Sequence, residues 1–134
     1  MENKLKHKSN QLAILLLLIV ATAFTSLNTL DEVVMNLRKG NAVQIADNFD
    51  KTVDLTLPGK SGSYDKETAT LLLKDFFQKR SIRDFDVLHQ GNQPQAKFCI
   101  GNLFTGSGNF RTTVYIKHKA GRFLLQEIRF ETIR

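Results

Sequence analysis

Apolar positions after residue 29 first recur at the spacing of an α-helix. Leu30, Val33, Val34 and Leu37 fall on one helical face and predict a helix over residues 30–40. Acidic residues occupy its first turn, basic residues its last, and a glycine closes it. A shorter stripe predicts a second helix over residues 41–49, with Asn41 as its N-cap and Phe49 as its last apolar residue.

The middle of the chain predicts a strand followed by a longer helix. Residues 52–57 alternate and are rich in β-branched side chains, which predicts a strand that Pro58 and Gly59 end. Residues 60–64 form either a loop or a brief return strand. Asp65 is placed to cap a helix that runs to Arg80. The apolar residues expected on its buried face are Ala69, Leu72, Leu73, Phe76 and Phe77.

From Arg83 onward the period changes to two, which is typical of β-strands. Strands are predicted over residues 85–90, 96–105, 110–118 and 122–131, separated by short turns that contain glycine. Consecutive strands joined in this way form an antiparallel meander. The order of helices, strand, helix and then strands indicates an α+β fold, in which a curved antiparallel sheet wraps around the N-terminal helices.

The N-terminal segment has the pattern of a secretory signal peptide. Three lysines precede an apolar run over residues 12–20, and the run ends in Ala21, Thr22 and Ala23. An uncleaved membrane anchor is the alternative, but a spanning helix needs about 20 apolar residues. We therefore predict a signal peptide over residues 1–23 and a domain over 30–131. The protein is expected to be exported to the periplasm or the extracellular space, with no membrane contact after cleavage.

Composition narrows the class of protein further. Cleavage after Ala23 leaves about 110 residues, which is one domain of common size. The net charge of +6 falls on cleavage, because the signal holds three lysines and one glutamate. The remaining mixture of acids and bases indicates a solvated surface and no nucleic-acid partner. The single cysteine, Cys99, lies between apolar neighbours and is expected in the core, without a disulfide.

The order of elements resembles the nuclear transport factor 2-like superfamily, which has a cystatin-like, cone-shaped fold. Several segments look like parts of that fold: residues 39–49 its opening helices, 73–77 its third helix, and 85–91 and 101–105 its central strands. The chain is also similar to a group of small exported bacterial proteins of unknown function. Their recurring features include residues 74–77, the turn at 89–91 and the terminal strand 125–131. The resemblance implies a cone with a pocket between sheet and helices, and often a homodimer packed through the sheet.

Motifs for cofactors and metals are incomplete in this sequence. Gly59, Lys60 and Ser61 imitate a phosphate-binding loop, but Asp54 occupies the position of its first glycine. Residues 106–108 fail as a dinucleotide fingerprint, because Arg111 replaces the third glycine. After the predicted signal, His89 and His118 are the only histidines and lie far apart in sequence. We therefore predict neither a cofactor nor a metal site.

His89 is the weak candidate for catalysis. Simple alternation places it on the same face as Phe85 and Val87, toward the core, where an imidazole could act as a general base. A histidine bonded to backbone is the plainer interpretation. Ketosteroid isomerase, in the same superfamily, uses an acidic base and a tyrosine in the cone, and this sequence does not match that pattern. The residues expected to line a ligand site in the cone are Phe49, Tyr64, Phe76, Phe77, His89 and Tyr115.

The last two strands present a polar surface. Glu127, Arg129 and Glu131 share one face of the final strand, and Arg111 and Tyr115 share one on its neighbour. Cross-strand ion pairs or a self-complementary dimer surface would explain them.

The sequence favours an exported, non-enzymatic protein that binds a small apolar or amphipathic molecule or acts as an accessory protein. One alternative is a hydrolase or isomerase with His89 as base. Another is a structural interaction module whose cone is filled by phenylalanine side chains.

Overall fold

The structure is a computed structural model that describes residues 10–11 and 28–134. Apart from Asn10 and Gln11, the predicted signal peptide therefore lies outside the described residues. No helix within the described ranges is long and apolar enough to cross a membrane.

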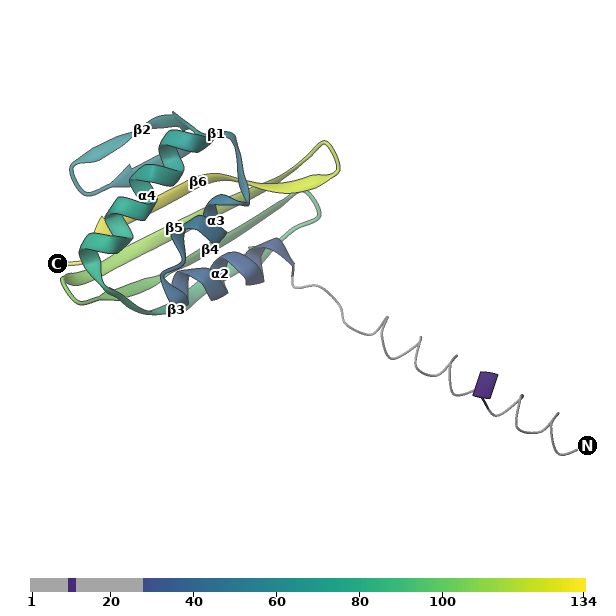
Figure 1. The fold of residues 1–134 in the computed structure, drawn as a ribbon, viewed down its shortest axis with the longest axis horizontal. Coiled ribbons are helices and arrows are strands. Elements are labelled where there is room, and N and C mark those ends of the chain that lie inside the picture. Colours follow the sequence, from purple (N-terminus) through teal and green to yellow (C-terminus); the bar gives the residue numbers. More distant parts are fainter. Residues whose placement is uncertain (1–9, 12–27) are drawn as a thin grey trace, which may run out of the picture.

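The described chain forms one curved sheet with helices on its inner side (Figure 1). The helices are α2 (Thr29–Lys39), α3 (Ala42–Ala46) and α4 (Lys66–Arg80). The strands are β1 (Phe49–Leu57), β2 (Lys60–Asp65), β3 (Ile82–Asn92), β4 (Ala96–Thr105), β5 (Gly108–Lys119) and β6 (Arg122–Thr132). The sheet has six strands in the order β2-β1-β6-β5-β4-β3. This arrangement confirms the predicted α+β fold with a curved sheet.

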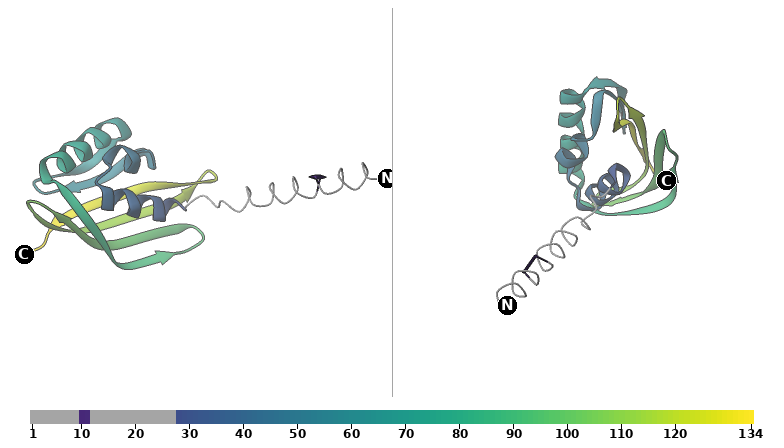
Figure 2. Two further views of the ribbon diagram at one scale, coloured as in Figure 1. Left: turned by 60° about the horizontal axis from the view of Figure 1, so that its bottom comes forward. Right: turned by 90° about the vertical axis from the view of Figure 1, so that its right-hand side faces the viewer.

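Strand pairing follows the predicted meander from β3 to β6, and all three of those junctions are antiparallel. β1 pairs parallel with β6 and antiparallel with β2. Residues 60–65 are therefore a return strand. Seen from the side, the sheet curves around the helices, with α2 beside β3 and α4 beside β1 and β2 (Figure 2).

The helix ends confirm several predictions. Gly40 adopts the left-handed conformation (φ 67°) that stops α2, and its N–H bonds to carbonyls of the last turn. Asn41 accepts a hydrogen bond from the N–H of Gln44 at the start of α3. Asp65 accepts from the N–H of Thr68 at the start of α4. Each cap satisfies helix-end groups that would otherwise lack partners.

The prediction for Phe49 was wrong. It was expected at the end of the second helix, but α3 stops at Ala46, and Phe49 begins β1 opposite Leu125 of β6. The backbone N–H of Leu125 also bonds the carbonyl of Asn48. Pairing with a strand more than seventy residues away therefore overrides the short-range helical pattern.

The core lies between the concave face of the sheet and the helices. One row across the sheet shows its construction: Cys99, Val114, Ile128 and Leu55 are register neighbours on four adjacent strands, and all are buried. Such alternation of buried and exposed positions gives one apolar face for the helices to cover.

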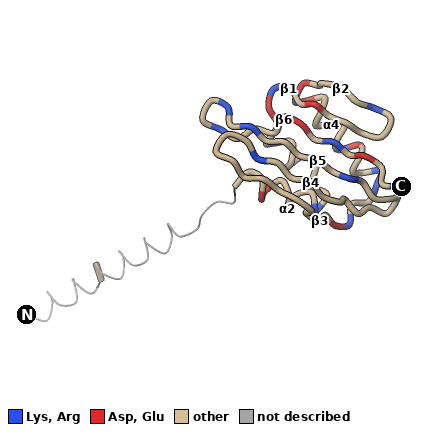
Figure 3. The backbone as a smooth tube through the Cα atoms, turned by 180° about the vertical axis from the view of Figure 1, so that it is seen from behind, with Lys and Arg blue, Asp and Glu red and all other residues tan. Residues whose placement is uncertain are grey.

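A buried carboxylate ties the β5–β6 hairpin to β1. Asp50, 7% exposed, accepts hydrogen bonds from Gln126 Nε2 at 2.9 Å and from Lys119 Nζ at 3.0 Å. Lys119 ends β5, at the hairpin whose basic residues are blue in the view from behind (Figure 3). The hydrogen bonds from Gln126, from the N–H of Lys51 and from Lys119 outweigh burial and lower the pKa of Asp50 to about 2.

Asp50→Asn should lower the free energy of unfolding by about 1–2 kcal/mol at pH 6, because it leaves Lys119 without its anionic partner. The pKa of Asp50 in the folded protein lies below the ordinary 3.8. Its stabilising effect is therefore complete above pH 4 and is lost as the pH falls toward 2. Urea unfolding at pH 6 and pH 2.5 should show a difference between wild type and variant that shrinks at the lower pH.

Asp75→Asn is the matched control, because Asp75 forms an exposed pair with Lys79 on α4. Exposed pairs contribute little to stability, so this change should stay within about 0.5 kcal/mol. Equal stability of Asp50→Asn and wild type at pH 6 would contradict the prediction.

Candidate functional site

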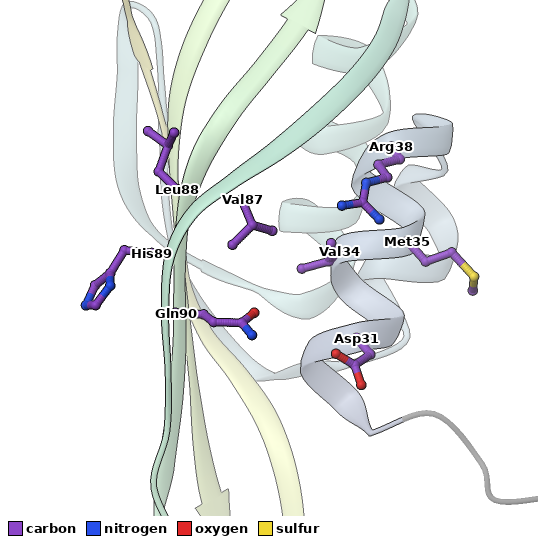
Figure 4. A pocket seen from close by; sticks show the side chains of 8 residues that line it. All are labelled: Asp31, Val34, Met35, Arg38, Val87, Leu88, His89 and Gln90. Carbon is purple, nitrogen blue, oxygen red and sulfur yellow. The ribbon is translucent and has the colours of Figure 1, made fainter.

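A groove runs between helix α2 and strand β3, the edge strand of the sheet (Figure 4). Its volume is about 770 Å³. The residues that line it are Asp31, Val34, Met35 and Arg38 of α2 and Val87, Leu88, His89 and Gln90 of β3. We call this the α2–β3 groove.

Helical spacing brings the α2 residues of the groove to one side of the helix. Asp31, Val34, Met35 and Arg38 stand at positions i, i+3, i+4 and i+7, which share a face. Val34 is buried against the core and Met35 is half-buried, whereas Asp31 and Arg38 are exposed. The helix therefore presents an apolar centre between an acidic and a basic end.

The β3 wall of the groove is shaped by a β-bulge. The register with β4 shifts by one residue between Val87 and His89. Val87 and Gln90 point toward α2, while the intervening Leu88 and His89 both point to the other side (Figure 4). Two consecutive residues on one side of a strand are what an inserted residue produces.

Arg38 covers the outer edge of β3 just before the bulge. Its Nε donates to the carbonyl of Phe85 at 3.0 Å, and the N–H of Phe85 donates to Asp84 Oδ1 at 2.8 Å. The backbone N–H and C=O of Phe85, which face the outer edge of β3, are thus both hydrogen-bonded to side chains. The ring of Phe85 lies where a Cβ on Gly101 would stand, 2.4 Å from that position, so glycine is required for this close approach.

Four of the phenylalanines pack together between α4 and the sheet. Phe76 and Phe77 of α4 meet Phe110 and Phe130, with ring centroids 5.0 to 5.8 Å apart across the interface. The guanidinium of Arg80 lies over the rings of Phe76 and Phe110 at 5.2 and 5.3 Å. We call Phe76, Phe77, Phe110 and Phe130 the aromatic cluster, and it fills this part of the cone.

The other residues expected to line one pocket are dispersed. Phe49 borders a second groove of about 570 Å³ at the start of β1. Tyr64 packs against the core from β2. Tyr115, 38% exposed, lies on the outer face of the sheet, opposite Phe98 and Glu127 in the register. The structure therefore does not bring the six expected residues together in one site.

The expected orientation of His89 was wrong. His89 is exposed and points away from the helices, with its ring 5.4 Å from that of Phe98. The bulge at Leu88 reverses the alternation that would have placed His89 beside Phe85 and Val87. His89 borders the α2–β3 groove from outside, and its role as general base stays a prediction that this placement does not favour.

Cys99 is fully buried, as the sequence predicts, and burial raises the pKa of its thiol to about 11. The thiol therefore stays protonated near neutral pH and is a poor nucleophile. In the part of the chain that the structure describes, no group of three or more metal-binding side chains lies close together.

Ion pairs on the outer face of β6 differ from the expected cross-strand arrangement. Arg129 pairs with Glu127 and Glu131 along its own strand, at 3.9 and 2.5 Å. Arg111 donates from Nε to Asn102 on β4. These polar contacts occupy the side of the sheet away from the helices.

Sequence reasoning missed the α2 side of the groove, although two signals were present. Met35 is apolar but stands outside the stripe of Leu30, Val33 and Leu37, so the core does not account for it. The adjacent apolar residues Val87 and Leu88 interrupt the alternation at the position of the bulge.

A comparison with protein-family models identifies the family of this chain. Residues 30–131 match the family model described as a domain of unknown function, DUF4783. The chain belongs to the DUF4783 family. A comparison with the curated proteins finds no match.

Solved structures of DUF4783 proteins share the fold. A protein of this family from Bacteroides uniformis is 29% identical, with a TM-score of 0.75, and the match covers 78% of this chain and 96% of that one. One from Bacteroides ovatus is 31% identical, with a TM-score of 0.72 and coverage of 77% and 94%.

A more distant structure extends the likeness in fold. An NTF-2 like protein of unknown function from Burkholderia xenovorans is 11% identical, with a TM-score of 0.60 and coverage of 79% and 82%. This DUF4783 chain therefore has the nuclear transport factor 2-like fold that its order of elements resembles.

Replacing Arg38 should expose the edge of β3. Arg38→Ala removes the donor to the Phe85 carbonyl and should lower the free energy of unfolding by about 1 kcal/mol. Amide hydrogen exchange should accelerate in β3 more than in β5. Lys39→Ala, at the exposed neighbouring position, is the control and should leave both measurements nearly unchanged. Identical exchange in the two variants would show that Arg38 does not protect this edge.

Proposed function

We propose that this DUF4783 protein is an exported, non-enzymatic binding protein that holds an amphipathic ligand in the α2–β3 groove. Export is part of the proposal and derives from the sequence of residues 1–23. The groove is the observation that carries the proposal, since its volume of about 770 Å³ lies in the range of small-ligand sites.

The chemistry of the groove supports an amphipathic ligand. Val34 and Val87 point toward each other across the groove and supply apolar contact, and Met35 adds a further apolar lining residue (Figure 4). Asp31 and Gln90 supply a carboxylate and an amide at its margin. A few polar groups around an apolar floor fix a ligand's orientation without reacting with it. The aromatic cluster favours a site outside the cone, because its rings occupy space that an enclosed ligand would need.

Met35→Glu should weaken ligand binding in the groove, because it replaces an apolar residue that lines the groove with a charge. Native mass spectrometry of protein produced from the full-length chain should show a reproducible small-molecule adduct. Titration with anilinonaphthalene sulfonate, a fluorescent amphipathic probe, measures the same site. Both signals should fall at least about tenfold in the variant.

Leu71→Glu is the control for this experiment. Leu71 is 68% exposed on α4, away from the groove, so its replacement should preserve both signals. A protein that carries no adduct and binds the probe equally in all three forms would overturn the proposed function.

We also propose that two copies associate through the outer face of the sheet. Phe98, Ile100 and Phe104 of β4 are only half-buried there, and Tyr115 of β5 lies directly opposite Phe98. A half-exposed apolar strip beside the charged residues of β6 suits a surface that is covered in an assembly.

Tyr115→Glu should therefore weaken self-association at least about tenfold, because a charge replaces an aromatic ring next to Phe98 of the strip. Light scattering after size exclusion, over a range of concentrations, measures the mass. Leu71→Glu again serves as control. A monomer at every concentration for wild-type protein would refute association through the sheet.

A further inference from the structure

The outer edge of β3 next to the α2–β3 groove has backbone groups that no other element uses. In an antiparallel pair, the backbone groups of every second residue point in the same direction. On β4 one such set of alternate residues is Leu103, Gly101, Cys99 and Lys97. Their partners on β3 are Phe85, Val87, Gln90 and Asn92.

The contacts of Phe85 show which way those backbone groups point. Its carbonyl bonds Arg38, and its N–H bonds Asp84, so both groups point away from β4. By the same alternation, the N–H and C=O groups of Val87, Gln90 and Asn92 also point outward. Within residues 28–134, no hydrogen bond from another element reaches the backbone of these three residues.

The edge is thus closed at Phe85 and open alongside the groove. Natural sheets usually protect an edge strand with charges, bulges or covering elements, because an open edge pairs with other chains. Here the protection by Arg38 and Asp84 ends where the groove begins. An open edge beside an apolar wall is the arrangement that binds an extended peptide as an added strand.

We propose that the groove binds a short extended peptide segment of a partner protein, which adds to the edge of β3 between Val87 and Asn92. This inference rests on the proposed function and names the class of its ligand. Alternate side chains of the added strand would face α2, where Val34 points toward β3 and Met35 also borders the groove (Figure 4). The peptide is therefore expected to carry apolar residues at every second position that faces the helix.

Charge at the groove adds a second requirement. The Asp31 carboxylate lies at the margin of the groove, and among the described residues no ion pair involves it. The guanidinium of Arg38, at the other end, is bonded to Phe85. Because no ion pair within the described residues neutralises Asp31, its carboxylate favours a basic side chain in the peptide at that end of the groove.

A second copy of this chain fits the same edge less well. Pairing two β3 strands over their length would meet the closed position at Phe85 and the bulge at Leu88 in each copy. A short flexible segment needs only the open stretch and can follow the local twist of a bulged edge.

Selection of short random peptides displayed on phage, against protein from the full-length chain, tests the proposal. Enriched peptides are synthesised, and their dissociation constants are measured by fluorescence anisotropy. Two versions of each peptide are then compared, one methylated at the odd-numbered backbone nitrogens and one at the even-numbered. One version should lose binding and the other should keep it nearly unchanged, because only every second N–H of an added strand faces β3. Met35→Glu should weaken binding at least about tenfold, and Leu71→Glu should not.

Three results would overturn the peptide proposal. The first is that no peptide is enriched on the wild-type protein relative to the Met35→Glu protein. The second is that the two methylated versions of a peptide bind equally well, and the third is that the protein forms a dimer through the β3 edge. If a small-molecule adduct sensitive to Met35→Glu is present but no peptide is enriched, the proposed function stands and the peptide class is wrong. If neither is found, both fail.

Discussion

Aromatic rings packed between α4 and the concave face of the sheet hold the two layers of the protein together. A curved sheet exposes one apolar face, and that face is stable only when helices cover it. Phe76 and Phe77 reach from α4 to Phe110 of β5 and Phe130 of β6, which joins the last two strands to the middle of the chain. With this volume filled by side chains, the accessible space moves outward to the margin of the sheet.

At that margin a single inserted residue determines which side chains of β3 face the groove. The bulge at Leu88 turns Gln90 toward α2 and His89 away from it, so the groove gains an amide and loses an imidazole. The same bulge lies next to Phe85, whose edge groups are covered by Arg38 and Asp84. The edge strand is therefore protected on one side of the bulge and accessible on the other, and the proposed peptide site rests on this contrast.

The fold by itself does not assign a function. Members of one fold family carry different sites, and function resides in the side chains grafted onto the scaffold. The likeness to an NTF-2 like protein at 11% identity therefore informs the architecture alone. What distinguishes this chain is the combination of a packed cone, an amphipathic groove and an open stretch of backbone at one edge of the sheet. These features together are the basis of the proposed binding function.

Elements with local signals could be predicted from the amino-acid sequence. Gly40 ends α2, Asn41 and Asp65 cap the next helices, and β4 spans Ala96–Thr105 as its alternation predicts. Side-chain caps and period-two patterns act over a few residues, so they can be read without knowledge of distant partners.

Features that depend on pairing between distant segments could be found only in the folded chain. Phe49 joins β1 because β6 pairs with it, and His89 faces outward because the register with β4 shifts beside it. The α2–β3 groove exists only where a helix and a strand about fifty residues apart lie side by side. Strand register and the contact of separate elements are set by the free energy of packing the whole chain, which no short window of sequence contains.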